Sequence, residues 1–155
     1  MGLFKKKDSY ADGQYLEQSK ESPERERLNE NIILKSDIDK MDGIQFSELV
    51  RVIFKRTGYE FLPLDLSGDY GADFFVAQYK MKLVVRAVKY QKNTSIRIEI
   101  DKLCAANRHY KSDRAWFVTS GFLTQYERMA VPSFVNITDR KDLIGLIELA
   151  KKSKI

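Results

Sequence analysis

The sequence predicts an α/β fold in which a mixed sheet of about five strands is flanked by helices. Apolar residues recur at spacings of three and four in some segments, as in amphipathic helices, and cluster in short runs bounded by turn residues in others, as in strands. Along the chain these segments follow the order helix, three strands, helix, strand, helix, strand, helix. This order is typical of a mixed sheet with helices packed against it.

The most regular helix is predicted between Asp42 or Gly43 and Gly58, which ends it. Further helices are predicted over residues 95–109, 121–129 and 139–151, the second starting near Thr124 and the third capped by Asp139. The apolar face of the first helix is formed by Ile44, Phe46, Leu49, Val50, Ile53 and Phe54.

Strands are predicted at residues 60–66, 72–78, 81–90, 115–119 and 133–138. Pro63 has no amide hydrogen, so the first strand lies at an edge or is broken there. The second and third runs are separated only by Tyr79 and Lys80, which predicts an antiparallel hairpin. Residues 67–71 form a turn by composition.

The 155 residues support one domain and a short additional segment. Residues 1–36 are predicted to be mobile and partly helical, with a short helix started by Ser22 and Pro23, and residues 37–155 form the folded domain. The chain has no apolar run long enough for a bilayer, and no secretory signal is expected from its basic start without an apolar segment behind it. Its single cysteine, Cys104, fits a reducing cytoplasm.

The formal net charge of +5 is unevenly distributed. Residues 1–40 hold eight Lys and Arg against nine Asp and Glu, whereas residues 41–155 hold 19 against 13. Between Lys80 and Lys111 nine basic residues are opposed only by Glu99 and Asp101. This field favours a polyanion such as DNA, and a solvated basic face is the alternative.

Several segments, in their order along the chain, resemble Mrr-type restriction endonucleases of the PD-(D/E)xK nuclease superfamily. The similarity spans about 110 residues, and it implies a restriction-endonuclease-like fold. It is carried by Asp39–Phe46, Gly58-Tyr59, Ser67–Asp73, Val84-Val85 to Lys89-Tyr90, Tyr110–Asp113, Val118-Thr119 with Phe122 and Thr124, and Thr138–Arg140 with Leu143.

The resemblance implies Mg²⁺-dependent DNA cleavage, in which an aspartate at one strand and Glu-x-Lys or Gln-x-Lys on the next hold the metal and stabilise the attacking hydroxide. The resemblance identifies Asp73 with the aspartate that binds the metal. The alternative is that the Asp73 carboxylate only caps backbone amides. The Glu-x-Lys or Gln-x-Lys motif is missing, because Arg86 replaces its Glu or Gln and Val88 replaces its lysine. If Arg86 shares a face with Val84 and Val88, its guanidinium is expected to pair with Asp73 and oppose the metal.

Three lysines are candidate replacements. Lys89 could turn inward through a β-bulge at Ala87-Val88, Lys82 has the right strand parity, and Lys102 could reach in from the following helix. Glu48 is a candidate second acid. His109 has no partner at motif spacing, and Cys104 is interpreted as a small core residue.

Three hypotheses follow. The first is a DNA-binding Mrr-like protein with a degenerate site (Asp73, Arg86, Lys89). The second is an active Mg²⁺-dependent endonuclease with a relocated lysine. The third is a protein-interaction module, with a homodimer or another protein as partner. The candidate DNA contacts are Lys80, Lys82, Lys89, Lys92 and Arg97.

Overall fold

The structure is a computed structural model that describes residues 21–65 and 71–153. The chain divides into two compact units, residues 1–32 and 33–155. The described part of the first unit consists mostly of the helix α3 (Pro23–Leu34), whose last two residues belong to the second unit. The sequence predicted a helix from Pro23 to about Asn31, so the observed helix is three residues longer. Most of the predicted mobile segment and of the 67–71 turn lies outside the described residues.

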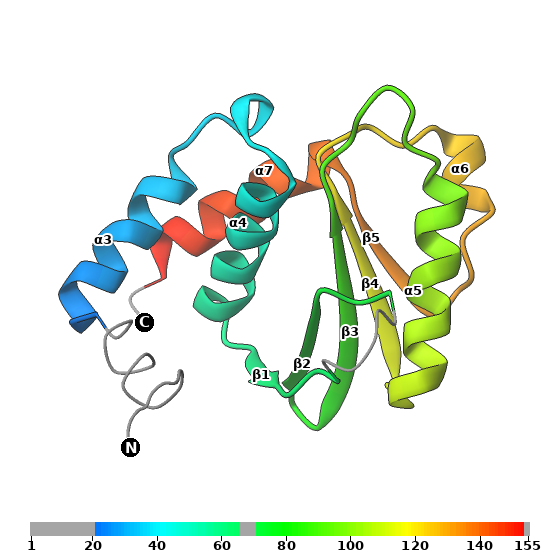
Figure 1. Ribbon diagram of the computed structural model, residues 1–155, viewed down its shortest axis with the longest axis horizontal. Helices are drawn as coiled ribbons and strands as arrows, with labels where there is room; N and C mark the ends of the chain where they lie inside the picture. The colour runs from blue at the N-terminus through cyan, green and yellow to red at the C-terminus, as the bar shows by residue number, and fades with distance from the viewer. Residues whose placement is uncertain (1–20, 66–70, 154–155) are drawn as a thin grey trace, which may run out of the picture. The chain divides into compact units, whose positions relative to one another are not determined.

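The second unit contains a five-stranded mixed sheet with helices on both faces (Figure 1). Its strands are β1 (Glu60–Leu62), β2 (Phe74–Gln78), β3 (Met81–Val88), β4 (Arg114–Thr119) and β5 (Val135–Thr138), and its helices are η1 (Ile38–Lys40, 3₁₀), α4 (Gly43–Arg56), α5 (Ile96–Tyr110), α6 (Gln125–Met129) and α7 (Arg140–Lys152). This architecture confirms the predicted fold class.

The strands lie in sequence order, β1-β2-β3-β4-β5. β1, β2 and β3 form an antiparallel meander, whereas β4 is parallel to β3 and β5 is parallel to β4. The parallel pairs require crossover connections, which α5 and α6 supply. β1 ends at Leu62, immediately before Pro63, and occupies the edge of the sheet, as expected for a strand that proline interrupts.

Two hydrophobic cores lie on the two faces of the sheet. One is built from α4 and α7 against alternate residues of the strands, among them Val85 and Val118. The other is built from α5 against the intervening residues, among them Val84 and Phe117. Adjacent residues of β3 and β4 therefore point to opposite cores, which explains why both strands are apolar on consecutive positions.

Side-chain caps fix where the helices begin. Asp42 caps α4 in a reciprocal capping box with Gln45, and Thr124 forms the same arrangement with Glu127 at α6. Asp139 caps α7 by accepting hydrogen bonds from the amides of Lys141 and Asp142. The predicted helix starts at Thr124 and Asp139 are thus confirmed. In the described residues no helix is long and apolar enough to cross a membrane.

Candidate nuclease-fold site

Asp73 lies directly before β2, opposite the C-terminal half of β3. Its backbone N–H donates to the Val85 carbonyl oxygen at 2.7 Å. Its carboxylate oxygen Oδ2 accepts a hydrogen bond of 2.7 Å from the backbone N–H of Ala87. The carboxylate thus serves as an acceptor on the hydrogen-bonding edge of β3, in the position where a neighbouring strand would offer a carbonyl. An amide contact of this kind is what the alternative interpretation of Asp73, a carboxylate that caps backbone amides, expects.

Gly71 brings the segment before Asp73 against α5. Its φ is +88°, and a Cβ atom at this position would collide with the backbone carbonyl of Lys102. Only glycine satisfies both the left-handed backbone and the close approach. The start of β2 and the middle of α5 therefore lie side by side, and the side chains of α5 can reach the end of β3.

Arg86 and Glu99 form an ion pair between β3 and α5. Arg86 Nε donates to Glu99 Oε1 at 2.7 Å, and the two side chains are only 16% and 18% exposed. Lys102 Nζ lies 3.9 Å from the other carboxylate oxygen of Glu99. The sequence predicted that Arg86 pairs with Asp73. This prediction is wrong, because the partner of Arg86 is Glu99 on α5. Arg86 does share the α5 face with Val84, as predicted.

Val88 occupies the position at which the family carries its lysine, and it packs against the core on the α5 face. The pairing of β3 with β4 runs without interruption from Leu83 to Val88, so no β-bulge in this pairing turns Lys89 inward. An aliphatic side chain here neither holds nor moves a proton. The end of β3 thus presents a paired cation and a packed apolar residue instead of an acid and a lysine.

A divalent metal does not fit this arrangement. Within residues 21–65 and 71–153 no group of three His, Cys, Asp or Glu side chains is placed to hold a metal ion. Asp73 is engaged by the Ala87 amide, and the Arg86 guanidinium stands where a carboxylate or amide ligand is needed. Glu48, the candidate second acid, lies on α4 and accepts a hydrogen bond from Arg51 Nε at 2.9 Å.

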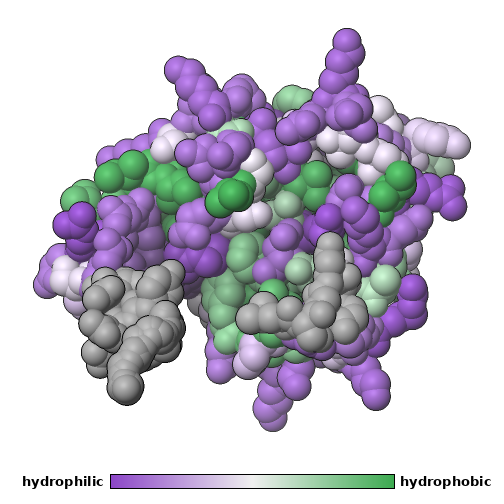
Figure 2. Space-filling view, viewed as in Figure 1, coloured by the Kyte–Doolittle hydropathy of each residue, from purple (hydrophilic) through white to green (hydrophobic). Residues whose placement is uncertain are grey.

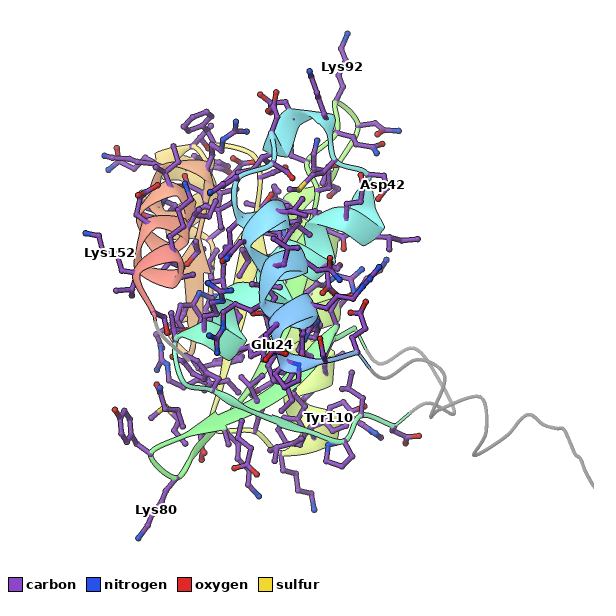
Figure 3. The ribbon with its side chains drawn as sticks, turned by 90° about the vertical axis from the view of Figure 1, so that its left-hand side faces the viewer. Glu24, Asp42, Lys80, Lys92, Tyr110 and Lys152 are labelled. Carbon is purple, nitrogen blue, oxygen red and sulfur yellow. The ribbon has the colours of Figure 1, made fainter. Side chains whose placement is uncertain are left out.

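The predicted basic residues separate into two groups at opposite ends of β3. Lys80 lies in the hairpin turn before the strand, whereas Lys92 lies in the loop after it, and Figure 3 shows them at opposite ends of the domain. Seven residues of extended chain, roughly 23 Å, separate Lys82 from Lys89. On the face drawn in Figure 2, hydrophilic side chains project at both of these ends.

Lys89 lies close to an ion pair at the C-terminal end of β3. Arg140 Nη1 contacts Asp39 Oδ1 at 2.9 Å, and this hydrogen bond, with a smaller contribution from the Lys89 charge, holds the pKa of Asp39 below its usual value. Arg97 lies 3.9 Å from Asp101 on the exposed side of α5. These cations, with Lys92, lie at the end of β3 that carries Arg86 and Val88.

The two remaining candidates, Cys104 and His109, both lie on α5. Cys104 is buried on α5, and burial raises the pKa of its thiol, which lowers the thiolate fraction. His109 Nε2 lies 3.5 Å from Asp65 Oδ2 and stacks edge-on against Tyr110. Sequence reasoning missed Glu99 as a site residue, although it is one of only two acids in the basic stretch and lies in the first turn of α5.

Comparison with known proteins identifies the family. Residues 38–147 match the Mrr catalytic-domain family, described as a restriction endonuclease. No curated protein matches by sequence. The DNA modification-dependent restriction endonuclease AspBHI has a similar structure, with a TM-score of 0.55 and 18% identity over 88% of this chain. The chain spans 38% of the length of that enzyme. The match over more than half of its residues shows that this chain belongs to the Mrr-type restriction-endonuclease family.

Proposed function

We propose that this protein binds DNA through a restriction-endonuclease fold whose nuclease site no longer cleaves. The observation that carries the proposal is the Arg86–Glu99 ion pair together with Val88 at the end of β3. Metal-dependent phosphodiester cleavage needs carboxylate or amide ligands at the first position and a cationic group at the second. Here the first position holds a cation paired with Glu99, and the second holds an aliphatic side chain.

The ion pair gives Arg86 a stabilising role of its own. A mostly buried guanidinium without an acid would carry a desolvation penalty, and Glu99 offsets it with a short charge-assisted hydrogen bond. The pair also ties β3 to α5 across the core. Selection for stability could therefore maintain this residue after cleavage was lost.

The proposed DNA surface is formed by Lys89, Lys92 and Arg97 at this end of the sheet. Among the described residues Lys89 and Lys92 have no ion pair within 4 Å, and Arg97 has only an exposed one at 3.9 Å. Exposed lysines and arginines neutralise phosphates without reading base sequence. The expected binding is therefore weakly sequence-dependent and strongly salt-dependent.

Two measurements test this function. Isothermal titration of Mn²⁺ and Mg²⁺ into the protein, with Asp73→Ala as control, is expected to show no Asp73-dependent binding at millimolar metal. Titration of a fluorescent 30-base-pair duplex is expected to show binding that weakens steeply between low and physiological salt. Metal binding that disappears in Asp73→Ala, or the absence of any DNA binding, would contradict the proposal.

One observation favours an active endonuclease as the second candidate. Lys102 lies beside Glu99 on α5, so a lysine does reach the vicinity of the site. Such an enzyme would nick supercoiled DNA in the presence of Mg²⁺, and both Asp73→Ala and Lys102→Ala would abolish the nicking. The charge of Arg86 weighs against this candidate.

A protein-interaction role is the third candidate. Exposed apolar side chains gather on and before α6, where Phe122, Tyr126 and Met129 are all more than two-thirds exposed. A partner bound there, including a second copy of the chain, would be insensitive to salt compared with DNA. Sedimentation of the protein alone at several concentrations tests self-association.

A further inference from the structure

The hairpin between β2 and β3 turns through two residues in a backbone conformation that neither prefers. Tyr79 has φ +52° and Lys80 has φ +68°, and the flanking residues Gln78 and Met81 are directly paired. A two-residue turn with both φ values positive is strongly favoured by Asn-Gly, because other residues strain their Cβ atoms there. Residues held in such conformations recur where the side chains serve a function.

The two strained residues present their side chains to solvent. Tyr79 is 92% exposed, the highest value among the large hydrophobic side chains that the structure describes as exposed. The ring therefore gains nothing from the core, and Lys80 is exposed as well. Folding alone gives no reason to keep a tyrosine and a lysine at a turn where Asn-Gly would be more stable.

The base of the hairpin is fixed on both sides. Gln78 Nε2 donates to the carbonyl of Thr57 at the end of α4, at 3.0 Å. On the other side the backbone N–H of Lys82 donates to Asp113 Oδ2 at 2.8 Å, and the Asp113 N–H donates back to the Lys82 carbonyl at 2.9 Å. The tip is thus a rigid projection, and ordering it on binding costs little entropy.

The charge around the tip is positive. Lys80 and Lys82 lie on the hairpin, and Lys111 caps α5 two residues before Asp113, with φ +54°. In the part of the chain that the structure describes, the side-chain ammonium groups of these three lysines form no ion pair, and the Asp113 carboxylate beside Lys82 is bound to its backbone N–H. An exposed aromatic ring flanked by lysines whose ammonium groups form no ion pair is a combination suited to nucleic acid, because the ring offers contact area and the lysines neutralise phosphates.

We infer that the tip of the β2–β3 hairpin, formed by Tyr79 and Lys80 with Lys82 and Lys111 beside it, is a second DNA contact. It lies at the opposite end of β3 from Lys89, Lys92 and Arg97. The inference rests on the proposed DNA binding and adds a separate surface to it. Tyr79 provides ring contact with the duplex, and the lysines contact the phosphates on either side.

The test replaces the strained pair by the residues that the turn prefers. Tyr79→Asn combined with Lys80→Gly removes the ring and one charge, and it relieves the backbone strain. The expected thermal midpoint rises by about 2–8 °C. The affinity for a 30-base-pair duplex is expected to fall about tenfold, and the slope of log affinity against log salt to become about 0.9 shallower.

Two further variants separate the contributions. Tyr79→Asn alone is expected to lose affinity with little change in salt slope, because the charges remain. Lys92→Gly removes one charge from a turn at the opposite end of β3, and combined with the tip variant it is expected to give an additive loss. Additivity supports two separate surfaces.

The outcomes distinguish this inference from the proposed function. If the tip variant is more stable but binds DNA as the wild type does, the DNA contact at the tip is overturned. If the tip variant loses affinity while changes at Lys89, Lys92 and Arg97 have no effect, the tip contact stands and the proposed surface fails. If the wild type does not bind DNA, both are overturned.

Discussion

The identity of one residue on α5 changes how the site at the end of β3 is understood. From the sequence, Arg86 and Val88 could be recognised as departures from the family pattern, but the partner of Arg86 could not. Strand parity predicts that Arg86 lies on the same face as Val84, and the structure agrees. The helix that faces these residues is set by tertiary packing, which strand parity does not predict. Glu99 is brought to Arg86 because Gly71 allows α5 to approach β2 closely. Two segments separated in sequence thus decide the electrostatics of the site.

Removal of Glu99 is expected to destabilise the fold. Glu99→Gln leaves the Arg86 guanidinium half-buried with a neutral partner, and we expect a loss of about 2 kcal/mol in the free energy of unfolding, measured by urea denaturation. The control is Glu148→Gln, which removes an exposed i,i+3 pair with Lys151 and should cost less than about 0.5 kcal/mol. Equal effects of the two substitutions would contradict the structural role of Glu99.

Reintroducing the family residues is expected to restore metal binding. Arg86→Glu with Val88→Lys removes the cation and places a second carboxylate beside Glu99, and a divalent metal relieves the resulting repulsion. We expect Mn²⁺ binding by isothermal titration in this double variant and its loss on addition of Asp73→Ala. Absence of binding in a folded double variant would mean that Asp73 is not placed for a metal.

The secondary-structure elements were predicted largely correctly because their local signals agree with their burial. Asp42, Thr124 and Asp139 were each identified as a helix start or a candidate for one, and each caps the helix that follows. β1 ends at Leu62, where Pro63 predicted an interruption. The sequence did not reveal that the hairpin turn is strained, because Tyr79-Lys80 carries no signature of a turn with positive φ values.

Packing between β2 and α5 is expected to depend on Gly71. Gly71→Ala introduces a Cβ atom into the Lys102 carbonyl and strains the left-handed backbone, so we expect a loss of at least about 2 kcal/mol in stability. Gly145→Ala in α7 is the matched control, since nothing lies within 4 Å of the added atom. Alanine is more favourable than glycine in a helix interior, so the free energy of unfolding of this control should rise by about 0.5–1 kcal/mol. Thermal or urea unfolding compares the two.

The start of α7 is expected to make stability pH-dependent. Burial alone would raise the pKa of Asp139, but the hydrogen bonds from the Leu123 amide and from Arg128 outweigh it and hold the pKa below its usual value. The stabilisation is therefore present above about pH 4, the usual value for an aspartate, and is lost as pH falls through the lowered pKa. Asp139→Asn keeps a capping side chain but not the charge.

The difference in unfolding free energy between wild type and Asp139→Asn should be constant from pH 5 to 8 and shrink below pH 4. Guanidinium or urea titrations at a series of pH values measure it. A difference that grows on acidification would contradict the assigned direction of the pKa.

At the scale of the whole molecule, the basic charge is divided between the two ends of the sheet. The sequence showed one basic stretch, and only the direction of β3 separates Lys80 and Lys82 from Lys89 and Lys92. A count of charges could not predict this division, because it depends on where the strand begins and ends. The division converts one candidate DNA surface into two that can be tested independently.

The proposed surface beside Arg86 and Val88 should account for part of the salt dependence of DNA binding. Replacing Lys89, Lys92 and Arg97 by Ala together is expected to reduce the slope of log affinity against log salt by about 2–3. Duplexes of different sequence should lose affinity equally, because phosphate contacts carry no sequence information. Replacing Lys151, Lys152 and Lys35 by Ala serves as a control for total charge, and an equal loss there would show that only the net charge matters.

Under the proposed loss of cleavage, the Arg86–Glu99 pair also restricts how the family activity could be regained during evolution. A mutation of Arg86 alone to an acid sets two carboxylates against each other in a half-buried position, so the intermediate is less stable before any metal binds. It still lacks a lysine at Val88, so it gains no cleavage to offset that loss. The route back therefore crosses variants that are worse than the present protein in both respects, and the ion pair acts as an epistatic barrier against reversion.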